Sequence, residues 1–168
     1  MNAIKKYLIL TVFIVGISLS SYAQYWTAPS GIREIPVPTL NDIAIASFDG
    51  YGPVIYYNPN ITNQVGPLVT AFFHAHEYGH HNLGHVTAQI INKNNPYVQI
   101  WLNSTAENAA DAYAVRYHVQ RGNKGVLQAT YRRFVNFPNN GDATHPPSTV
   151  RANNIANLYY QLTGASLF

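Results

Sequence analysis

The sequence predicts an α+β domain, in which a small N-terminal sheet precedes a bundle of about four helices. Two β-rich runs, 42–48 and 53–57, flank a turn at Asp49-Gly-Tyr-Gly52, which is typical of a hairpin or of two adjacent strands. From residue 66 onward the apolar residues recur at helical spacing instead. Of the 168 residues, 47% are hydrophobic and 10% are charged, so the chain has apolar material for one core and is not a charged, disordered chain.

The individual elements are bounded by residues that interrupt regular structure. Residues 24–41 contain three prolines and a glycine and are expected to form an irregular, extended entry. The first helix begins near Pro67, because proline suits the first turn of a helix, and an Asn- and Pro-rich break follows at 92–96. Three further helices are predicted, at 104–121, 125–137 and 148–163, with a loop at 139–147 before the last of them. We expect a single domain over residues 24–168.

Residues 1–23 have the three parts of a secretory signal peptide. Lys5 and Lys6 supply the positive start, a thirteen-residue apolar run follows at 7–19, and Ser21-Tyr-Ala23 is a small-residue cleavage site. An uncleaved anchor helix is the alternative, but the apolar run is shorter than the roughly 20 residues that cross a bilayer. We therefore expect a cleaved leader, a periplasmic or secreted protein, and no transmembrane span after the leader.

Charge and cysteine content exclude several classes of function. The chain has ten basic and seven acidic side chains, and without Lys5 and Lys6 the excess of positive charge falls to one. No basic patch is visible, so nucleic-acid binding is not expected. The absence of cysteine excludes disulfides, cysteine-based zinc sites and thiol nucleophiles. Histidine is the exception, because five of the seven lie between residues 74 and 85.

The segment His76-Glu-Tyr-Gly-His80 is an HExxH motif on the first predicted helix. Residues four apart project from one face of a helix, so both imidazoles can converge on one metal ion. Glu77 then lies beside the ion rather than at it, where it can act as a general base and return the proton to the leaving amine. A catalytic zinc site needs a third protein ligand as well.

The segment Glu107-Asn-Ala-Ala-Asp111 on the next predicted helix offers that ligand. Glu107 can reach the ion while Asp111, one turn further on, holds the ring N–H of a zinc-binding histidine. The alanines around them make this helix small-sided, so it can approach the histidine helix closely. Two alternatives stay open: Ser104 and Glu107 also form a capping box, and Asp142 is another carboxylate that can serve as ligand. The HExxH motif upstream favours the metal role for Glu107.

A third segment, Thr144-His-Pro-Pro-Ser-Thr-Val-Arg151, places His145 in a turn and Arg151 on the helix that follows. Both side chains can donate a hydrogen bond to an oxyanion. The spacing alone favours a plainer interpretation, in which the histidine is incidental to a helix start and the arginine is solvated.

Four segments occur in an order that resembles the zinc peptidases that include HtpX and the CaaX prenyl endopeptidase. They read VIYYNP, AHEYGHHNLGH, AENAADAYA and THPPSTVR, and the resemblance spans about residues 51–155. It implies a zincin-like minimal domain of the gluzincin type that cleaves peptides, most simply as an endopeptidase. It also implies one Zn²⁺ ion bound by His76, His80 and Glu107, with Glu77 as the general base.

The same resemblance assigns roles to the remaining segments. Asp111 becomes the partner of His76, and His145 and Arg151 become stabilisers of the transition state. The strand before the zinc helix is implied to pair with an extended substrate through Val54, Ile55, Tyr56 and Tyr57. Typical relatives are embedded in membranes, and only 26 residues separate His80 from Glu107 here. We therefore expect an exposed groove for a peptide or protein substrate rather than a walled cavity for a prenylated one.

Two other functions stay open. The first is a zinc domain without catalysis, which binds a peptide or partner, and the second is a metal-dependent hydrolase of a non-peptide bond. The intact Glu77 favours an enzyme, because a structural site needs no base beside its ligands. The other histidines have no role in the motifs, and a second metal site is the alternative for them: His74, His81, His85 and His118. The sequence does not predict the oligomeric state.

Overall fold

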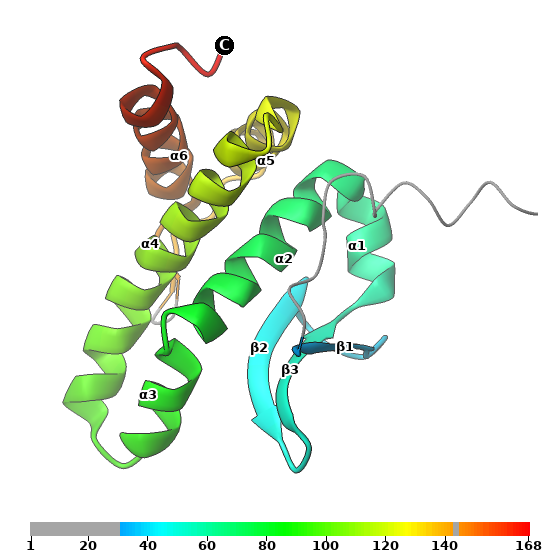
Figure 1. Ribbon diagram of the computed structural model, residues 1–168, viewed down its shortest axis with the longest axis vertical. Helices are drawn as coiled ribbons and strands as arrows, with labels where there is room; N and C mark the ends of the chain where they lie inside the picture. Colours follow the sequence, from blue (N-terminus) through cyan, green and yellow to red (C-terminus); the bar gives the residue numbers. More distant parts are fainter. Residues whose placement is uncertain (1–30, 143–144) are drawn as a thin grey trace, which may run out of the picture.

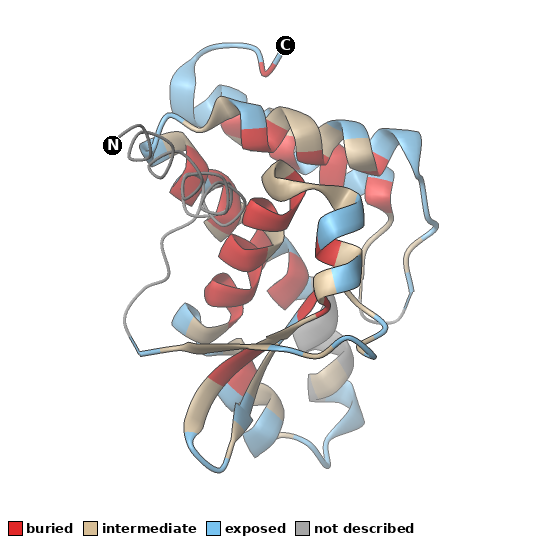
Figure 2. Cartoon of the chain, turned by 90° about the vertical axis from the view of Figure 1, so that its right-hand side faces the viewer, coloured by how far each residue is buried: buried red, intermediate tan, exposed pale blue. Residues whose placement is uncertain are grey.

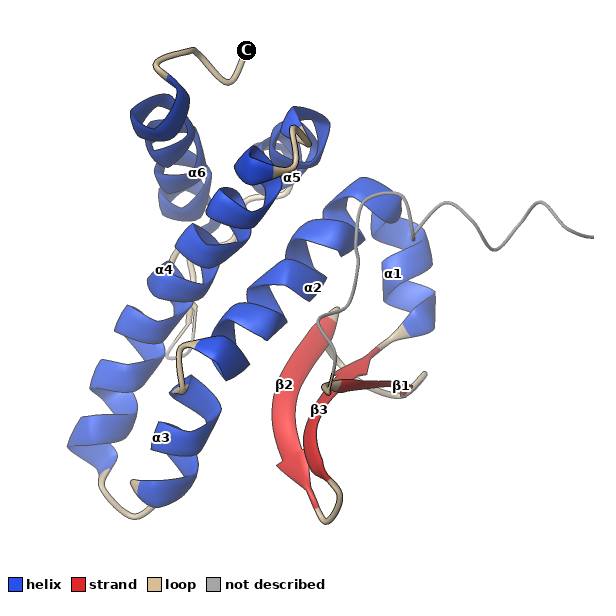
Figure 3. Cartoon of the chain, in the orientation of Figure 1, coloured by secondary structure: helices blue, strands red, loops and turns tan. Residues whose placement is uncertain are grey.

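The computed structural model describes residues 31–142 and 145–168 (Figure 1). The predicted signal peptide, residues 1–23, lies outside the described residues, and so does the first part of the expected entry segment. Within the described residues a three-stranded sheet precedes six helices, which confirms the α+β class (Figure 3). None of these helices is both long enough and apolar enough to cross a membrane.

The sheet has the strand order β1-β3-β2, where β1 is Arg33–Pro36, β2 is Ala44–Asp49 and β3 is Gly52–Tyr57. The predicted pair of adjacent strands is confirmed, because β2 and β3 pair antiparallel around the expected turn. The irregular conformation expected for residues 24–41 is wrong at β1, which pairs parallel with β3. Its proline is accommodated because β1 is an edge strand and Pro36 is its last residue.

The position of β3 in the middle of the sheet corrects the expectation for the substrate strand. Both edges of β3 are used by its neighbours, with Val54 and Ile55 opposite β1 on one side and β2 on the other. The backbone of Val54–Tyr57 therefore has no free edge for an extended peptide, and that prediction is wrong. The free edge of the sheet beside α2 belongs to β2 (Figure 1).

The helices agree with the predicted order but not with every boundary. The break at 92–96 is confirmed as a turn between two helices, and the helix after it begins at Pro96 rather than at residue 104. Two short helices were not predicted, because one or two turns carry too little periodicity to be recognised. The six are α1 (Pro59–Val65), α2 (Pro67–Asn82), α3 (His85–Ile91), α4 (Pro96–Gln120), α5 (Lys124–Asn136) and α6 (Ser148–Thr163).

Helix α2 is the centre of the domain. The sheet packs against it on one side, and α4 and α5 pack against it on another, so its residues are buried over most of its length (Figure 2). The core that these helices share with α6 contains Phe72, Val115, Leu127 and Ile155. Because α2 is covered on several sides, the polar side chains of its HExxH motif are buried as well.

Helices α2 and α4 approach each other closely at Gly79. A Cβ atom at this position would lie 3.1 Å from the Cβ of Tyr113 and 3.2 Å from the Cα of Ala110. On the facing side of α4, Ala106, Ala110 and Ala114 are all buried. The predicted close approach of a small-sided helix is therefore confirmed, and it is what brings carboxylates of α4 within reach of α2.

His118 on α4 is fully buried in this core and takes no part in the HExxH cluster. Its Nε2 atom lies 3.3 Å from the carbonyl oxygen of Ala71, and its Nδ1 atom has no hydrogen-bond partner among the described residues. Burial, which disfavours the charged ring, lowers the pKa of His118 to about 4. The ring is therefore neutral at neutral pH and donates its Nε2–H across to α2.

Replacing His118 with glutamine is expected to make the free energy of unfolding less sensitive to acid. Between its ordinary pKa of 6.5 and the folded value of about 4, this side chain is protonated only in the unfolded chain. The wild-type protein therefore loses about 3 kcal/mol of stability at this residue between pH 7 and pH 4, and the variant does not. Glutamine keeps an amide N–H for Ala71. Urea unfolding at both pH values, with a chelator present, measures the difference, and equal acid sensitivity would contradict the prediction.

Candidate metal centre

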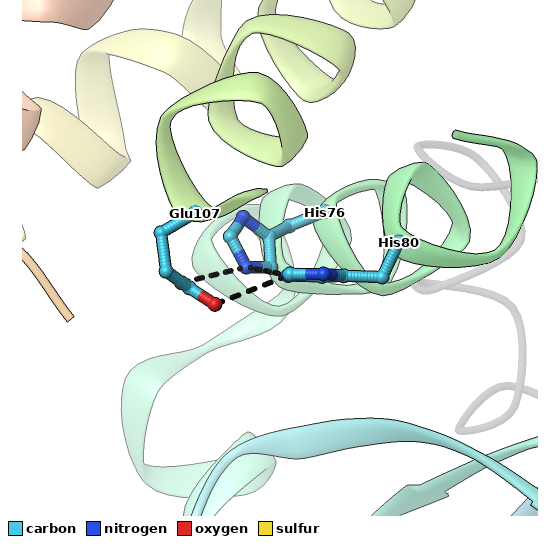
Figure 4. Close-up of side chains that lie close together, drawn as sticks. All are labelled: His76, His80 and Glu107. Atoms are coloured by element: carbon cyan, nitrogen blue, oxygen red, sulfur yellow. Dashed lines mark hydrogen bonds and ion pairs between the residues drawn. The ribbon is translucent and has the colours of Figure 1, made fainter. Parts of the chain in front are cut away.

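The structure brings His76, His80 and Glu107 together, as the sequence predicts. The two histidines project from one face of α2, and the glutamate reaches them from α4 (Figure 4). The two Nε2 atoms lie 3.0 Å apart. Each of them also lies 3.3 Å from one of the two carboxylate oxygens of Glu107. All three side chains are buried, so the cluster has little contact with water.

These distances fit a four-coordinate metal ion. A tetrahedron with metal–ligand bonds of about 2.0–2.1 Å has edges of about 3.3–3.4 Å. The 3.0 Å between the two Nε2 atoms is slightly shorter than such an edge, and each Nε2 atom lies 3.3 Å from a different oxygen of the Glu107 carboxylate. Two imidazole nitrogens and one carboxylate oxygen, which lie within 4.8 Å of one another, can therefore serve as three ligands of one metal ion.

The hydrogen bonding of the cluster also indicates a cation. The Nδ1–H of His76 donates to Asp111 at 2.9 Å, which leaves the Nε2 atom of a neutral ring as a lone pair directed at Glu107. The Oε2 atom of Glu107 is buried and accepts no hydrogen bond among the described residues. Acceptors that face one another in a buried space repel each other unless a positive charge lies between them.

In the absence of a metal ion, the pKa values indicate that a proton on His76 supplies this positive charge. Burial opposes charge on His76, but its hydrogen bond to Asp111 and the nearby carboxylate of Glu107 outweigh burial and raise its pKa to about 10. The pKa of His80 is lowered, chiefly by burial. Burial opposes the charge of Glu107, yet the two imidazoles hold its pKa well below the ordinary range. The charge distribution thus favours a cation between these three side chains, and a metal ion satisfies it with both rings neutral.

The alternative role of Glu107 in a capping box is wrong. Residue 104 lies inside α4, which begins at Pro96, so it cannot be the residue that precedes the first turn. The sequence signal was ambiguous because serine followed three residues later by glutamate occurs inside helices as well as at their ends. The side chain of Glu107 points to the histidines of α2 instead.

Asp111 lies where the sequence predicts, and its partner Arg151 does not contact the cluster directly. Two nitrogens of the guanidinium, Nε and one Nη, donate to the two oxygens of Asp111 at 2.8 and 2.7 Å. The guanidinium also lies over the rings of Phe73 and Phe134, at 5.6 and 4.8 Å from their centroids. Arg151 is thus buried and paired, rather than solvated, and holds the carboxylate that holds His76.

Replacing Arg151 with methionine is expected to lower the free energy of unfolding by about 3–5 kcal/mol, because Asp111 would keep a buried charge without its partner. Metal affinity should also fall by about 10–100-fold, since the ring of His76 loses its fixed support. Chemical unfolding and competition with a chelator measure the two effects. Arg132→Met, at an exposed arginine over the ring of Phe168, is the matched control. Unchanged stability and affinity with slower turnover would instead make Arg151 a donor to the transition state.

His145 reaches the edge of the cluster. Its Nε2 atom lies 3.7 Å from Oε2 of Glu107, and its side chain is 36% exposed. Asp142, the other carboxylate considered as a ligand, instead accepts a hydrogen bond from the backbone N–H of His145 at 2.8 Å. A partly exposed histidine thus lies close to Glu107, and Asp142 binds the backbone of that histidine rather than the cluster.

Glu77 is buried beside the cluster but does not belong to it. Its Oε2 atom accepts a hydrogen bond of 2.6 Å from the backbone N–H of Ala46 on β2. Burial raises the pKa of Glu77 to about 7, against the opposing effects of His76 and of the Ala46 N–H. The sequence carried no signal for the contact with Ala46, because it depends on the order of the strands in the sheet.

The other histidines near the motif have separate partners. His74 lies 3.2 Å from a carboxylate oxygen of Glu34 on β1, and His81 lies 3.0 Å from the carbonyl oxygen of Val54. His85 contacts His80. Among residues 31–142 and 145–168, His76, His80 and Glu107 are the only group of three with metal-ligand spacing, so these histidines do not form a second such site there.

No family of known proteins, no curated protein and no solved structure matches this chain.

Proposed function

We propose that this chain is a zinc-dependent metallopeptidase of the gluzincin type, similar to the family of HtpX and the CaaX prenyl endopeptidase. One observation carries the proposal: Glu77, a buried carboxylate, adjoins three converging metal ligands without being one of them. A site that only stabilises the fold gains nothing from such a group, because a buried carboxylate is costly. In hydrolysis it serves as the base that takes a proton from water.

Zinc is the ion that the ligand types favour, because two imidazole nitrogens and a carboxylate oxygen with an open position are typical of catalytic zinc sites. When bound, zinc would polarise the scissile carbonyl and acidify a water molecule. Glu77 would take the proton of that water and pass it to the leaving amine. In the metal-free chain burial raises the pKa of Glu77 to about 7, so this carboxyl group accepts a proton more readily than an exposed glutamate does.

The remaining residues hold this arrangement or assist it. Asp111 and Arg151 fix the ring of His76 from behind, with the Nδ1–H of the ring on Asp111. His145, which is partly exposed and lies 3.7 Å from Glu107, would donate a hydrogen bond to the carbonyl oxygen of the substrate as negative charge develops there.

We further propose that an extended peptide pairs with β2. Ala46 lies opposite Ile55 on β3, and its N–H donates to Glu77, so the N–H points away from β3 and toward α2. In an antiparallel pair every second residue has this orientation, so Ala44 and Phe48 share it with Ala46. Ala44 and Phe48 therefore present backbone groups on the edge of β2 that β3 does not use, on either side of the N–H that Ala46 gives to Glu77, and strand addition binds extended peptides at such an edge.

The proposal is tested by incubating the purified protein with a diverse peptide library in three states. These are zinc-loaded protein, protein stripped with a chelator, and stripped protein with zinc restored. Defined products should appear with zinc, disappear after chelation and return when zinc is restored, as read by mass spectrometry. Zinc-dependent retention of peptides without cleavage would instead indicate a binding module. Products that are indifferent to chelation would exclude a metal-dependent reaction.

A further inference from the structure

His85 lies directly behind the ligand His80. The Nδ1 atoms of the two rings are 3.2 Å apart, and the ring centroids are 5.1 Å apart with the planes inclined at 73°. The contact depends on a sharp turn, because α2 ends at Asn82 and α3 begins at His85. Gly84 adopts the left-handed conformation between them, with φ of +74°, which a residue with a side chain rarely adopts.

The two ring nitrogens of His80 face different groups of residues. Its Nε2 atom faces His76 and Glu107, at 3.0 and 3.3 Å, and is the atom that would bind the metal. A neutral imidazole that binds a metal through Nε2 carries its proton on Nδ1 and needs an acceptor there. Nδ1 of His85, at 3.2 Å from Nδ1 of His80, lies within reach of this N–H.

We propose that His85 is a positioning residue for the metal centre: its Nδ1 accepts the Nδ1–H of His80 and fixes both the tautomer and the rotation of that ring. This inference rests on the metal site of the proposed function. The two ligands of α2 are then held differently. His76 is held by a carboxylate that is itself paired with Arg151, and His80 is held by a neutral, half-buried imidazole whose proton is on Nε2.

Two substitutions separate the hydrogen bond from the packing of the ring. His85→Phe keeps a ring of similar size but removes the acceptor, and His85→Asn places an amide oxygen near the position of Nδ1 without the ring. We expect zinc affinity, measured by competition with a chromophoric chelator, to fall by about 10–100-fold in the Phe variant and to recover largely in the Asn variant. The matched control is His81→Phe, next to His80 in sequence but bound to Val54, which should leave zinc affinity within about twofold.

Substitution of cobalt for zinc provides a measurement that would not change if His85 only stabilised the fold. The visible absorption of Co²⁺ bound in place of zinc reports the geometry of its ligands, so the Phe variant should change the band shape and the Asn variant should restore it. Equal zinc affinities and equal spectra for the Phe variant and the wild type would overturn the proposal. So would a failure of the Asn variant to improve on the Phe variant.

The wild-type protein tests the inference without any variant. In the zinc-loaded protein, long-range ¹H–¹⁵N spectra of the imidazoles should show His80 protonated at Nδ1 and His85 protonated at Nε2. His85 protonated at both nitrogens or at Nδ1 would overturn the proposal. A wild-type protein that binds no zinc would overturn the proposed function itself, and zinc binding without peptide cleavage would remove the peptidase assignment while leaving His85 testable.

Discussion

Replacing Glu77 with glutamine is expected to abolish peptide cleavage while the protein still binds its metal. An amide cannot accept the proton of the attacking water, so kcat/KM should fall by about 10²–10⁴-fold. The side-chain oxygen of glutamine can still accept the N–H of Ala46, which keeps the contact between α2 and β2. Peptide cleavage measured by mass spectrometry and metal content measured by elemental analysis check the two halves of the prediction.

The matched control is Glu34→Gln, because Glu34 also contacts a histidine of α2 but lies away from the metal ligands. This variant should cleave at the wild-type rate. A Glu77→Gln protein that cleaves as fast as the wild type would show that the proton is taken by another group, and a protein that has lost its metal would show that Glu77 supports the ligands instead.

The same variant has an expected effect on stability, with the opposite pH dependence to that of His118. The pKa of Glu77 is raised to about 7 from an ordinary value of 4.5, so the folded chain holds a proton that the unfolded chain releases. Without metal, the wild-type protein should therefore lose about 3 kcal/mol of stability as the pH rises from 4.5 to 7. The Glu77→Gln protein should not lose it. Urea unfolding of both proteins across this range measures the difference.

Replacing Glu107 with alanine is expected to remove stoichiometric metal and, with it, cleavage. Two imidazoles alone do not complete a zinc site, because three protein ligands are needed beside the open position. Alanine is a good helix former and residue 107 lies inside α4, so the helix itself should persist. Metal content after dialysis against buffered zinc, together with circular dichroism, distinguishes a lost ligand from a lost fold.

Asn108→Ala provides the control for this experiment, because it changes the next residue of the same helix on an exposed face. It should retain both metal and helix content. Unchanged metal content in Glu107→Ala would mean that another group completes the site, and the carboxylate would then be only a buried neighbour of the histidines.

The parts of the site that were predicted from the sequence are those set by spacing along one helix. His76 and His80 share a face because they are four residues apart, and Glu107 and Asp111 do so for the same reason. Helix α2 also follows from local signals, since Pro67 suits its first turn and its apolar residues recur at helical spacing. None of these inferences needs knowledge of how distant segments meet.

The parts that were missed depend on such meetings. The strand order places β2, and not β3, at the free edge beside α2. Neither strand contains a residue from which its neighbours in the sheet could be predicted. Arg151 resembles a solvated arginine in the sequence and is buried only because Asp111 and two aromatic rings surround it. The role inferred for His85 depends on the turn at Gly84. If α2 continued as a regular helix past residue 82, residue 85 would lie on a different face from His80.

Gly79 shows that the two unspecified positions of the HExxH motif are not equivalent in this chain. It binds nothing, yet a single methyl group there would press on the backbone of Ala110 and the side chain of Tyr113 and would force a shift of a few tenths of an ångström. Coordination distances tolerate little more than that. Alanine at this position would thus push α2 and α4 apart and lengthen the distance between the histidines and Glu107, although every ligand would still be present in the sequence.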